Sequence, residues 1–169
     1  MILADATGGL KAKDLRQLRR AIALSADARA AGRHPFAATV VGADGAVLAE
    51  AGNNSMPPEG DATQHAKLRA ARMAFHAGSA AQLAGATLYS SVEPCAMCAG
   101  AIYWCGIGRV VYALSETSLL QLTGNHPENP TLSLPCGEVF ARGQRDVQVL
   151  GPALEAEAGA AHAGFWNRS

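Results

Sequence analysis

The stretch Pro94-Cys95-Ala96-Met97-Cys98 contains two cysteines at a spacing of three residues. The stretch His65-Ala66-Lys67, which lies earlier in the chain, begins with a histidine. Zinc prefers sulfur and nitrogen ligands, and a catalytic zinc takes three protein ligands and keeps its fourth position open. Proline favours the first position of a helix, so a helix beginning here places both thiols on one face near its N-terminus. The helix dipole at that end favours the metal-binding thiolate. The pattern predicts a zinc site built from His65, Cys95 and Cys98.

A closed structural zinc site and a redox-active cysteine pair are the alternatives to a catalytic zinc. A closed site needs a fourth protein ligand, and the candidates Cys136, His126 and His34 do not stand at ligand spacing in the sequence. A thioredoxin-like redox pair leaves His65 and the helix that follows it unexplained. The open, catalytic type of zinc site therefore fits the sequence best.

The composition is that of one folded domain, residues 1–169, because 49% of the residues are hydrophobic and only 17% are charged. The 14 basic and 14 acidic residues cancel, so we expect a small-molecule substrate and do not expect a nucleic-acid partner. We find no secretory signal and no apolar stretch of membrane-spanning length. These features predict a cytoplasmic protein without a membrane partner.

The hydrophobic pattern predicts alternating helices and strands. Apolar residues recur at helical spacing over residues 11–32, and a strand pair is joined by the hairpin signal Asp44-Gly45. A helix capped by Asp61 or Thr63 is expected to run to about Gly78. The other expected elements are strands over 36–41, 47–51, 86–92, 109–114 and 147–150, and helices over 94–105, 115–122 and 152–163. This alternation favours an α/β protein with three layers and a mixed, five-stranded sheet.

The chain resembles the cytidine-deaminase-like superfamily, and within it the bacterial guanine deaminases and the tRNA adenosine deaminases. The stretches that carry the resemblance are His34-Pro35-Phe36, Asn53-Asn54, Asp61-Ala62-Thr63-Gln64-His65-Ala66 and the run from Glu93 to Trp104. The end of that run, Gly100-Ala101-Ile102-Tyr103-Trp104, is most similar to guanine deaminase. The resemblance implies a three-layer α/β/α fold and a homodimer.

The resemblance also implies roles for individual residues. It implies His65, Cys95 and Cys98 as the zinc ligands and Asn53 as a hydrogen-bonding contact to the base. Groups near Ala66 are expected to meet a purine, and Phe36 is expected at the substrate. The C-terminal segment of guanine deaminases closes over the active site, so Trp166 is a candidate substrate contact. Docking of Trp166 and its neighbour Phe165 on the chain's own core is the alternative.

Lys67 is the departure from the pattern of zinc-dependent deaminases, which have a glutamate two residues after the histidine. In the family reaction, zinc hydroxide attacks the amino-bearing ring carbon, ammonia leaves, and the glutamate transfers the protons. A protonated lysine has no lone pair to accept a proton, and its positive charge opposes that of zinc. We therefore expect Lys67, at the catalytic position, to cripple turnover.

Three explanations fit Lys67. The one that we favour is a deliberate change from glutamate that stops turnover. The others are a natural protein that binds zinc and a base without turning the base over, and another carboxylate that transfers the protons in place of the glutamate. Glu59 and Glu93 are the nearest carboxylates in sequence. The function expected is zinc-dependent hydrolytic deamination of a purine nucleobase or nucleoside, with guanine favoured. The alternatives are an adenosine- or cytosine-type deaminase and a silent base-binding protein. The sequence does not identify the base, and the loop over residues 124–135 and the C-terminal segment are expected to select it.

Overall fold

A five-stranded sheet with the order β2-β1-β3-β4-β5 runs through the centre of the computed structural model, which describes residues 8–167. The strands are β1 Ala37–Val41, β2 Val47–Gly52, β3 Thr87–Val92, β4 Arg109–Leu114 and β5 Gln148–Leu150. Strand β1 pairs antiparallel with β2 and β3, whereas β3, β4 and β5 are parallel. The predicted mixed sheet is confirmed.

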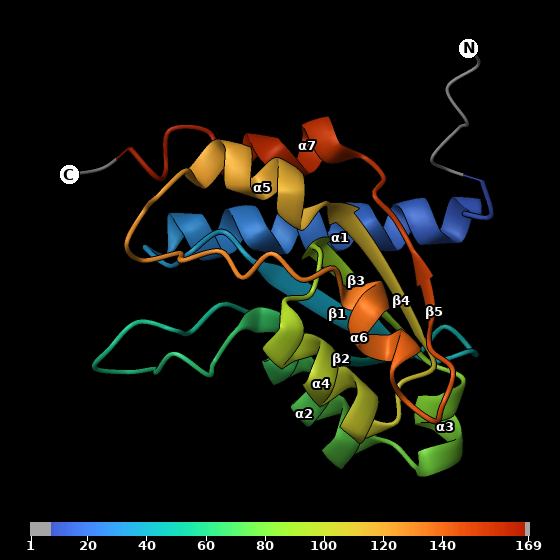
Figure 1. Ribbon diagram of the computed structural model, residues 1–169. Coiled ribbons are helices and arrows are strands. Elements are labelled where there is room, and N and C mark those ends of the chain that lie inside the picture. The colour runs from blue at the N-terminus through green and yellow to red at the C-terminus, as the bar shows by residue number, and fades with distance from the viewer. Residues whose placement is uncertain (1–7, 168–169) are drawn as a thin grey trace.

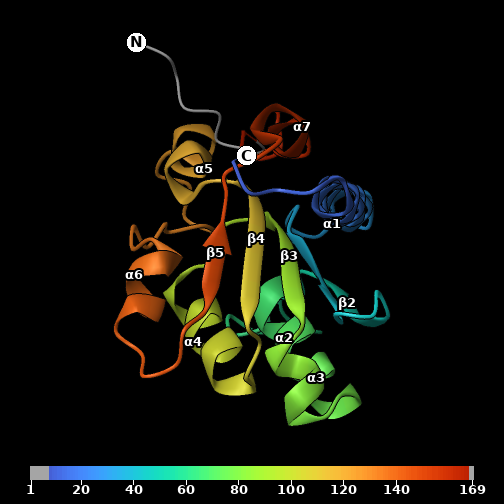
Figure 2. The same ribbon diagram turned by 90° about the vertical axis from the view of Figure 1, so that its right-hand side faces the viewer.

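Helices cover both faces of this sheet and complete the predicted three layers (Figures 1 and 2). One face carries α1 Ala12–Ala30, α5 Glu116–Thr123 and α7 Glu155–Ala160. The other face carries α2 Ala66–Ala77, α3 Ala80–Ala84, α4 Ala96–Cys105 and α6 Cys136–Ala141. Among residues 8–167, no helix has the length and apolar character needed to cross a bilayer.

The central strands are buried on both faces, because helices cover both sides of the sheet. Successive side chains of a strand point to opposite sides and so enter two different cores. Leu88 and Val110 belong to the hydrophobic core under α2 and α4. Their neighbours Tyr89 and Val111 belong to the core under α1 and α5. All six residues of β3 are buried, as expected for a strand that is covered by helices on both faces.

Several helix starts differ from the sequence prediction. Helix α4 begins at Ala96 after its N-cap Cys95, so Pro94 precedes the helix and does not hold its first position. Helix α2 is capped by His65 and begins at Ala66, whereas Asp61 accepts a hydrogen bond from the backbone N–H of Thr63, 2.8 Å away, in the preceding turn. The short helix α3 was not predicted, although Ser79 and Gln82 form the reciprocal capping box that marks its start. The later start of α2 places His65 at the N-terminal tip of the helix, where its side chain faces Cys95 at the start of α4.

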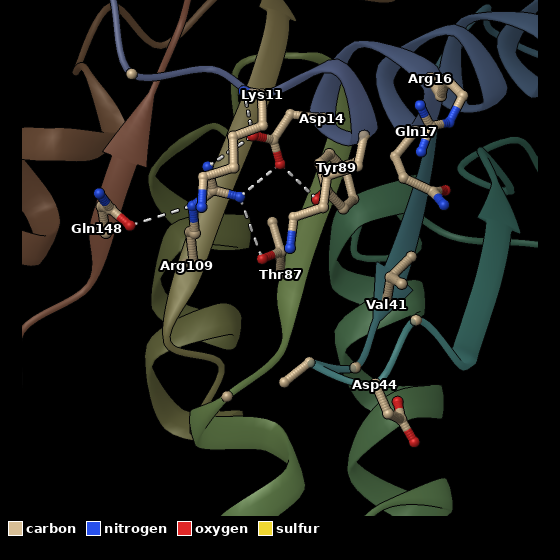
Figure 3. Close-up of a pocket in the computed structure, with 16 residues that line it drawn as sticks. Lys11, Asp14, Arg16, Gln17, Val41, Asp44, Thr87, Tyr89, Arg109 and Gln148 are labelled. Atoms are coloured by element: carbon tan, nitrogen blue, oxygen red, sulfur yellow. Dashed lines mark hydrogen bonds and ion pairs between the residues drawn. The ribbon is translucent and has the colours of Figure 1, made fainter.

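A buried ion pair fastens α1 to the central strands (Figure 3). Both Asp14 carboxylate oxygens accept hydrogen bonds from Arg109, at 2.8 and 3.1 Å, and one also accepts from the Tyr89 hydroxyl at 2.8 Å. The backbone N–H of Lys11 donates to the other oxygen. Burial alone raises the pKa of Asp14, but these hydrogen bonds outweigh it and lower the pKa well below its ordinary value. Asp14 and Arg109 line a surface cavity of about 610 Å³, and these two charged groups are therefore committed to one another.

Candidate functional site

The start of α4 and the start of α2 meet at the carboxyl end of strand β3. Cys95 is the N-cap of α4, Cys98 lies in its first turn, and His65 is the N-cap of α2. The ligand atoms of the three residues all lie within 4.8 Å of one another. Cys95 Sγ and His65 Nδ1 are 3.6 Å apart.

This spacing fits a tetrahedral zinc ion. Zinc bonds of about 2.3 Å to sulfur and about 2.05 Å to nitrogen separate the two ligand atoms by about 3.6 Å. In the described part of the chain, His65, Cys95 and Cys98 are the histidine, cysteine or carboxylate side chains whose ligand atoms lie close enough together to hold a metal ion. Cys136, His126 and His34, the candidates for a fourth ligand, are not in the group. The sequence prediction of a three-ligand zinc site is thus supported by geometry.

The two thiols are strongly coupled. A hydrogen bond from Cys98 lowers the pKa of Cys95 well below its ordinary value, and the positive charge of Lys67 adds to this effect. The same hydrogen bond and the burial of Cys98 raise the pKa of that thiol. The lowered pKa favours the thiolate form of Cys95, which is the form that binds a soft cation.

A cavity opens beside the triad in two parts. The inner chamber has a volume of about 50 Å³ and the outer part about 630 Å³. Residues lining the inner chamber include His34, Phe36, Asn53, His65, Lys67, Cys95, Glu116 and Glu128. The structure thus brings Phe36, Asn53 and Lys67 to the metal ligands, as predicted. It does not bring Ala66 or Trp166 into the cavity wall, so their contact with a base stays a prediction.

Asn53 has a fixed orientation in the wall. Its side chain is 2% exposed, and its Oδ1 accepts hydrogen bonds from the backbone N–H and the hydroxyl of Ser55, both at 2.9 Å. The amide oxygen is occupied by these two bonds, which leaves the amide nitrogen as the group that can donate to a ring acceptor.

Lys67 lies inside the cavity, on the first turn of α2. It is 4% exposed, and its Nζ is 4.8 Å from the centroid of the Phe36 ring. None of the ion pairs among residues 8–167 includes Lys67. The burial of an ammonium group that has no ion-pair partner costs free energy, so nearby negative charges in the cavity affect the stability of the fold.

The carboxylates that sequence reasoning nominated as substitutes do not reach the cavity. Glu93 is buried, and its two oxygens accept hydrogen bonds from the backbone N–H groups of Glu116 and Cys136, both at 3.0 Å. Glu59 is exposed on the loop before α2 and is absent from the cavity wall. Glu93 therefore joins two loops, and Glu59 faces solvent.

Glu116 is the cavity residue that the sequence analysis missed. It is the first residue of α5, and its Oε2 is buried without a hydrogen-bond donor among the described residues. Burial raises the pKa of Glu116 to about 7, although the positive charge of Lys67 acts in the opposite direction. A serine followed by a glutamate is an ordinary helix start, so nothing local in the sequence distinguishes this residue.

The C-terminal aromatic residues are buried behind the cavity wall. The Trp166 ring lies 5.2 Å from that of His34 and 6.0 Å from that of Phe36, and its Nε1 donates to His162 Nδ1 at 3.1 Å. His34 in turn contacts Glu128 at 2.9 Å across the cavity. Trp166 therefore packs against the wall residues His34 and Phe36 on the side that faces away from the cavity. Arg168 and Ser169 lie outside the described residues.

Truncation after Gly164 is expected to raise KM several-fold, because His34 loses the ring that holds it in the wall. Trp166→Phe keeps an aromatic ring against His34 and is the matched control, with KM expected near that of the native chain. Steady-state kinetics on both variants, with thermal unfolding to confirm that each is folded, measure the effect. An unchanged KM in the folded truncation would show that the segment has no influence on the site.

Comparisons with known proteins point to one family. Residues 11–114 match the family model described as the cytidine and deoxycytidylate deaminase zinc-binding region. A probable cytosine deaminase of Schizosaccharomyces pombe is 41% identical over 94% of this chain and 95% of its own length. The guanine deaminase of Bacillus subtilis is 44% identical, over 59% of this chain and 64% of its own length. The structure of a guanine deaminase from Nitrosomonas europaea superimposes with a TM-score of 0.72 at 25% identity, over 94% of this chain and 87% of that one.

Proposed function

Because the chain belongs to the zinc-dependent cytidine and deoxycytidylate deaminase family, we propose that it hydrolyses the amino group of a nucleobase, with an aminopyrimidine such as cytosine as the first candidate. The observation that carries the proposal is the His65–Cys95–Cys98 triad, which borders a small polar chamber. A zinc ion bound there supplies an activated water for attack on the ring carbon that bears the amino group.

The residues of the chamber suit a small amino-bearing ring. Asn53 presents an oriented donor, and the Glu128 carboxylate, held by His34, presents an acceptor for a ring N–H or an amino group. Phe36 offers an aromatic surface in the same wall. These groups bind and orient the base, and the narrow chamber excludes bulk water from it.

The guanine preference predicted from the sequence is not supported. It rested on the run that ends in Trp104, but that side chain is 82% exposed at the end of α4 and does not line the cavity. The S. pombe relative, by contrast, matches across 94% of this chain and 95% of its own length. The cytosine-type alternative is therefore the better supported one.

Ammonia release from a panel of free bases and nucleosides tests the proposal, with zinc content measured in the same samples. The panel comprises cytosine, isocytosine, cytidine, guanine, guanosine, adenine, adenosine and an aminotriazine. We expect turnover of an aminopyrimidine. Turnover of guanine alone would return the assignment to the purine class, and a zinc-loaded protein that binds bases without releasing ammonia would favour the silent binding protein that Lys67 suggests.

The homodimer implied by the family resemblance stays a prediction. An exposed tryptophan is the kind of side chain that an interface between subunits covers, and Trp104 is such a residue. Sedimentation velocity on the native chain and on Trp104→Ala decides whether a dimer forms and whether it uses this end of α4.

A further inference from the structure

We propose that Glu116 is the proton-transferring carboxylate of this site, reaching the cavity from helix α5 in place of the glutamate that Lys67 replaces on helix α2. The proposal rests on the deaminase function proposed above and identifies the residue that makes the reaction possible in this chain.

The topology holds Glu116 beside the metal ligands. Strands β3 and β4 are parallel neighbours, with Val92 paired to Leu114, so the residues that follow them emerge at the same edge of the sheet. Cys95 follows β3 and Glu116 follows β4. Ligands of such sheets bind outside the carboxyl ends of the strands, which is where both residues lie.

Glu93 fastens the two loops together. Its backbone N–H donates to the carbonyl of Leu114 at 2.8 Å, and its carboxylate accepts from the backbone N–H of Glu116 at 3.0 Å. Ser115 caps α5 by accepting a hydrogen bond from the backbone N–H of Ser118 at 3.1 Å. The backbone of Glu116 is therefore fixed relative to the loop that carries Cys95, as a proton-transferring group requires.

The side chain of Glu116 lines both parts of the cavity, together with His65 and Cys95. Its Oε2 is buried, and no group among the described residues donates to it. A buried carboxylate oxygen without a donor is costly, and folded proteins nearly always satisfy such atoms. This oxygen is therefore available to accept a hydrogen bond from a molecule in the cavity, such as the attacking water or the amino group of a base.

The charges of the cavity also call for a carboxylate at this place. A zinc dication and two thiolates cancel, so the buried ammonium of Lys67 leaves one positive charge in excess. Glu128 is half exposed and contacts His34, and Glu93 accepts hydrogen bonds from backbone N–H groups outside the cavity wall. Glu116 lines the same chamber as Lys67, so an ionised Glu116 offsets the buried ammonium, and the positive charge of Lys67 in turn lowers the pKa of Glu116.

The proton transfers balance with this single residue. As a water oxygen forms its bond to the amino-bearing ring carbon, Glu116 Oε2 accepts one water proton and passes it to the adjacent ring nitrogen. It then accepts the remaining hydroxyl proton and passes it to the amine as the carbon–nitrogen bond breaks and ammonia leaves. A carboxyl group whose pKa lies near neutrality is suited to both directions of transfer.

Glu116→Gln tests the assignment, since the amide keeps the size of the side chain and cannot accept the proton. We expect kcat to fall by about 10²–10⁴-fold, with zinc content and thermal stability retained and KM changed only a few-fold. Glu59→Gln, the exposed carboxylate that the sequence nominated, is the matched control and should leave kcat, KM and zinc content unchanged. A Glu116→Gln variant with native kcat would overturn the proposal while the deaminase function stands.

A second readout needs no substrate. Cobalt(II) in place of zinc gives a visible spectrum whose pH dependence reports protons shared with the open metal position. We expect its midpoint to move by more than about one pH unit in Glu116→Gln, as expected for a charge beside the site, and to stay in place in Glu59→Gln. If the midpoint is the same in both variants, Glu116 does not act at the metal, whether or not a substrate has been found.

Lys67→Met is expected to move the acid limb of the pH–rate profile to higher pH. The positive charge of Lys67 lowers the pKa of Glu116, while burial, Cys95 and Glu93 raise it, so loss of the lysine charge raises that pKa. His34 and Glu128 also face the cavity and are kept in this variant. An acid limb that stays in place would show that the limb belongs to another group.

Discussion

Cys95→Ala should lose its zinc and all measurable deamination. Cys95 is one of three protein ligands, and it contributes the sulfur whose pKa is already lowered before metal binding. Two remaining ligands leave a catalytic zinc with too few protein bonds to be held at micromolar metal concentrations. The expected loss therefore exceeds that of any variant that changes a proton-transferring or substrate-binding residue.

Cys105→Ala is the matched control for this prediction. Cys105 is the last residue of the same helix, α4, and is not in the metal-binding group. Zinc content by atomic emission and ammonia release, measured on both variants, decide the outcome. Stoichiometric zinc in Cys95→Ala, or loss of zinc in Cys105→Ala, would contradict the site described here.

Asp14→Ala should destabilise the fold by about 3–5 kcal/mol, because it removes one partner of a buried ion pair and leaves the Arg109 charge uncompensated. It also removes the acceptor of the Tyr89 hydroxyl, so α1 loses its polar attachment to β3 and β4. For a domain of this size the melting temperature should fall by about 6–20 °C. Denaturant and thermal unfolding of Asp14→Ala beside Asp27→Ala, an exposed aspartate on the same helix, measure the effect.

The same ion pair predicts how stability depends on pH. The pKa of Asp14 is lowered in the folded state, so its contribution is complete above its ordinary value of 3.8 and is lost as the pH falls below it. Near neutral pH, the free energy of unfolding of Asp14→Ala should therefore be lower than that of the native chain by an amount that does not depend on pH. This difference should shrink in acid. Equal stability of Asp14→Ala and Asp27→Ala at neutral pH would show that the ion pair is not a main support of the fold.

The zinc ligands could be predicted from the sequence because their chemistry is local. Cys95 and Cys98 stand at the spacing that places two thiols on one helix face, and few structural roles require that pattern after a proline. The alternation of strands and helices likewise indicated the layers of the fold. In both cases the information lies within one turn or one element.

The substrate side of the site could not be predicted in the same way, because it is assembled across the fold. Glu116 looks like an ordinary first-turn residue of α5, and only the pairing of β3 with β4 brings it beside Cys95. Glu93 is near Cys95 in sequence, yet backbone hydrogen bonds occupy its carboxylate. Proximity in sequence suggested Glu59 and Glu93 as substitutes for the missing glutamate, whereas the fold places Glu116 in the cavity wall.

Ammonia release by the native, zinc-loaded chain beside Lys67→Glu is the most direct test of the account. We expect the native chain, with Lys67 in place and Glu116 present, to deaminate at least one base of the panel, with an aminopyrimidine first. A silent native chain beside an active Lys67→Glu variant would contradict it, because position 67 and not Glu116 would then carry the proton transfers.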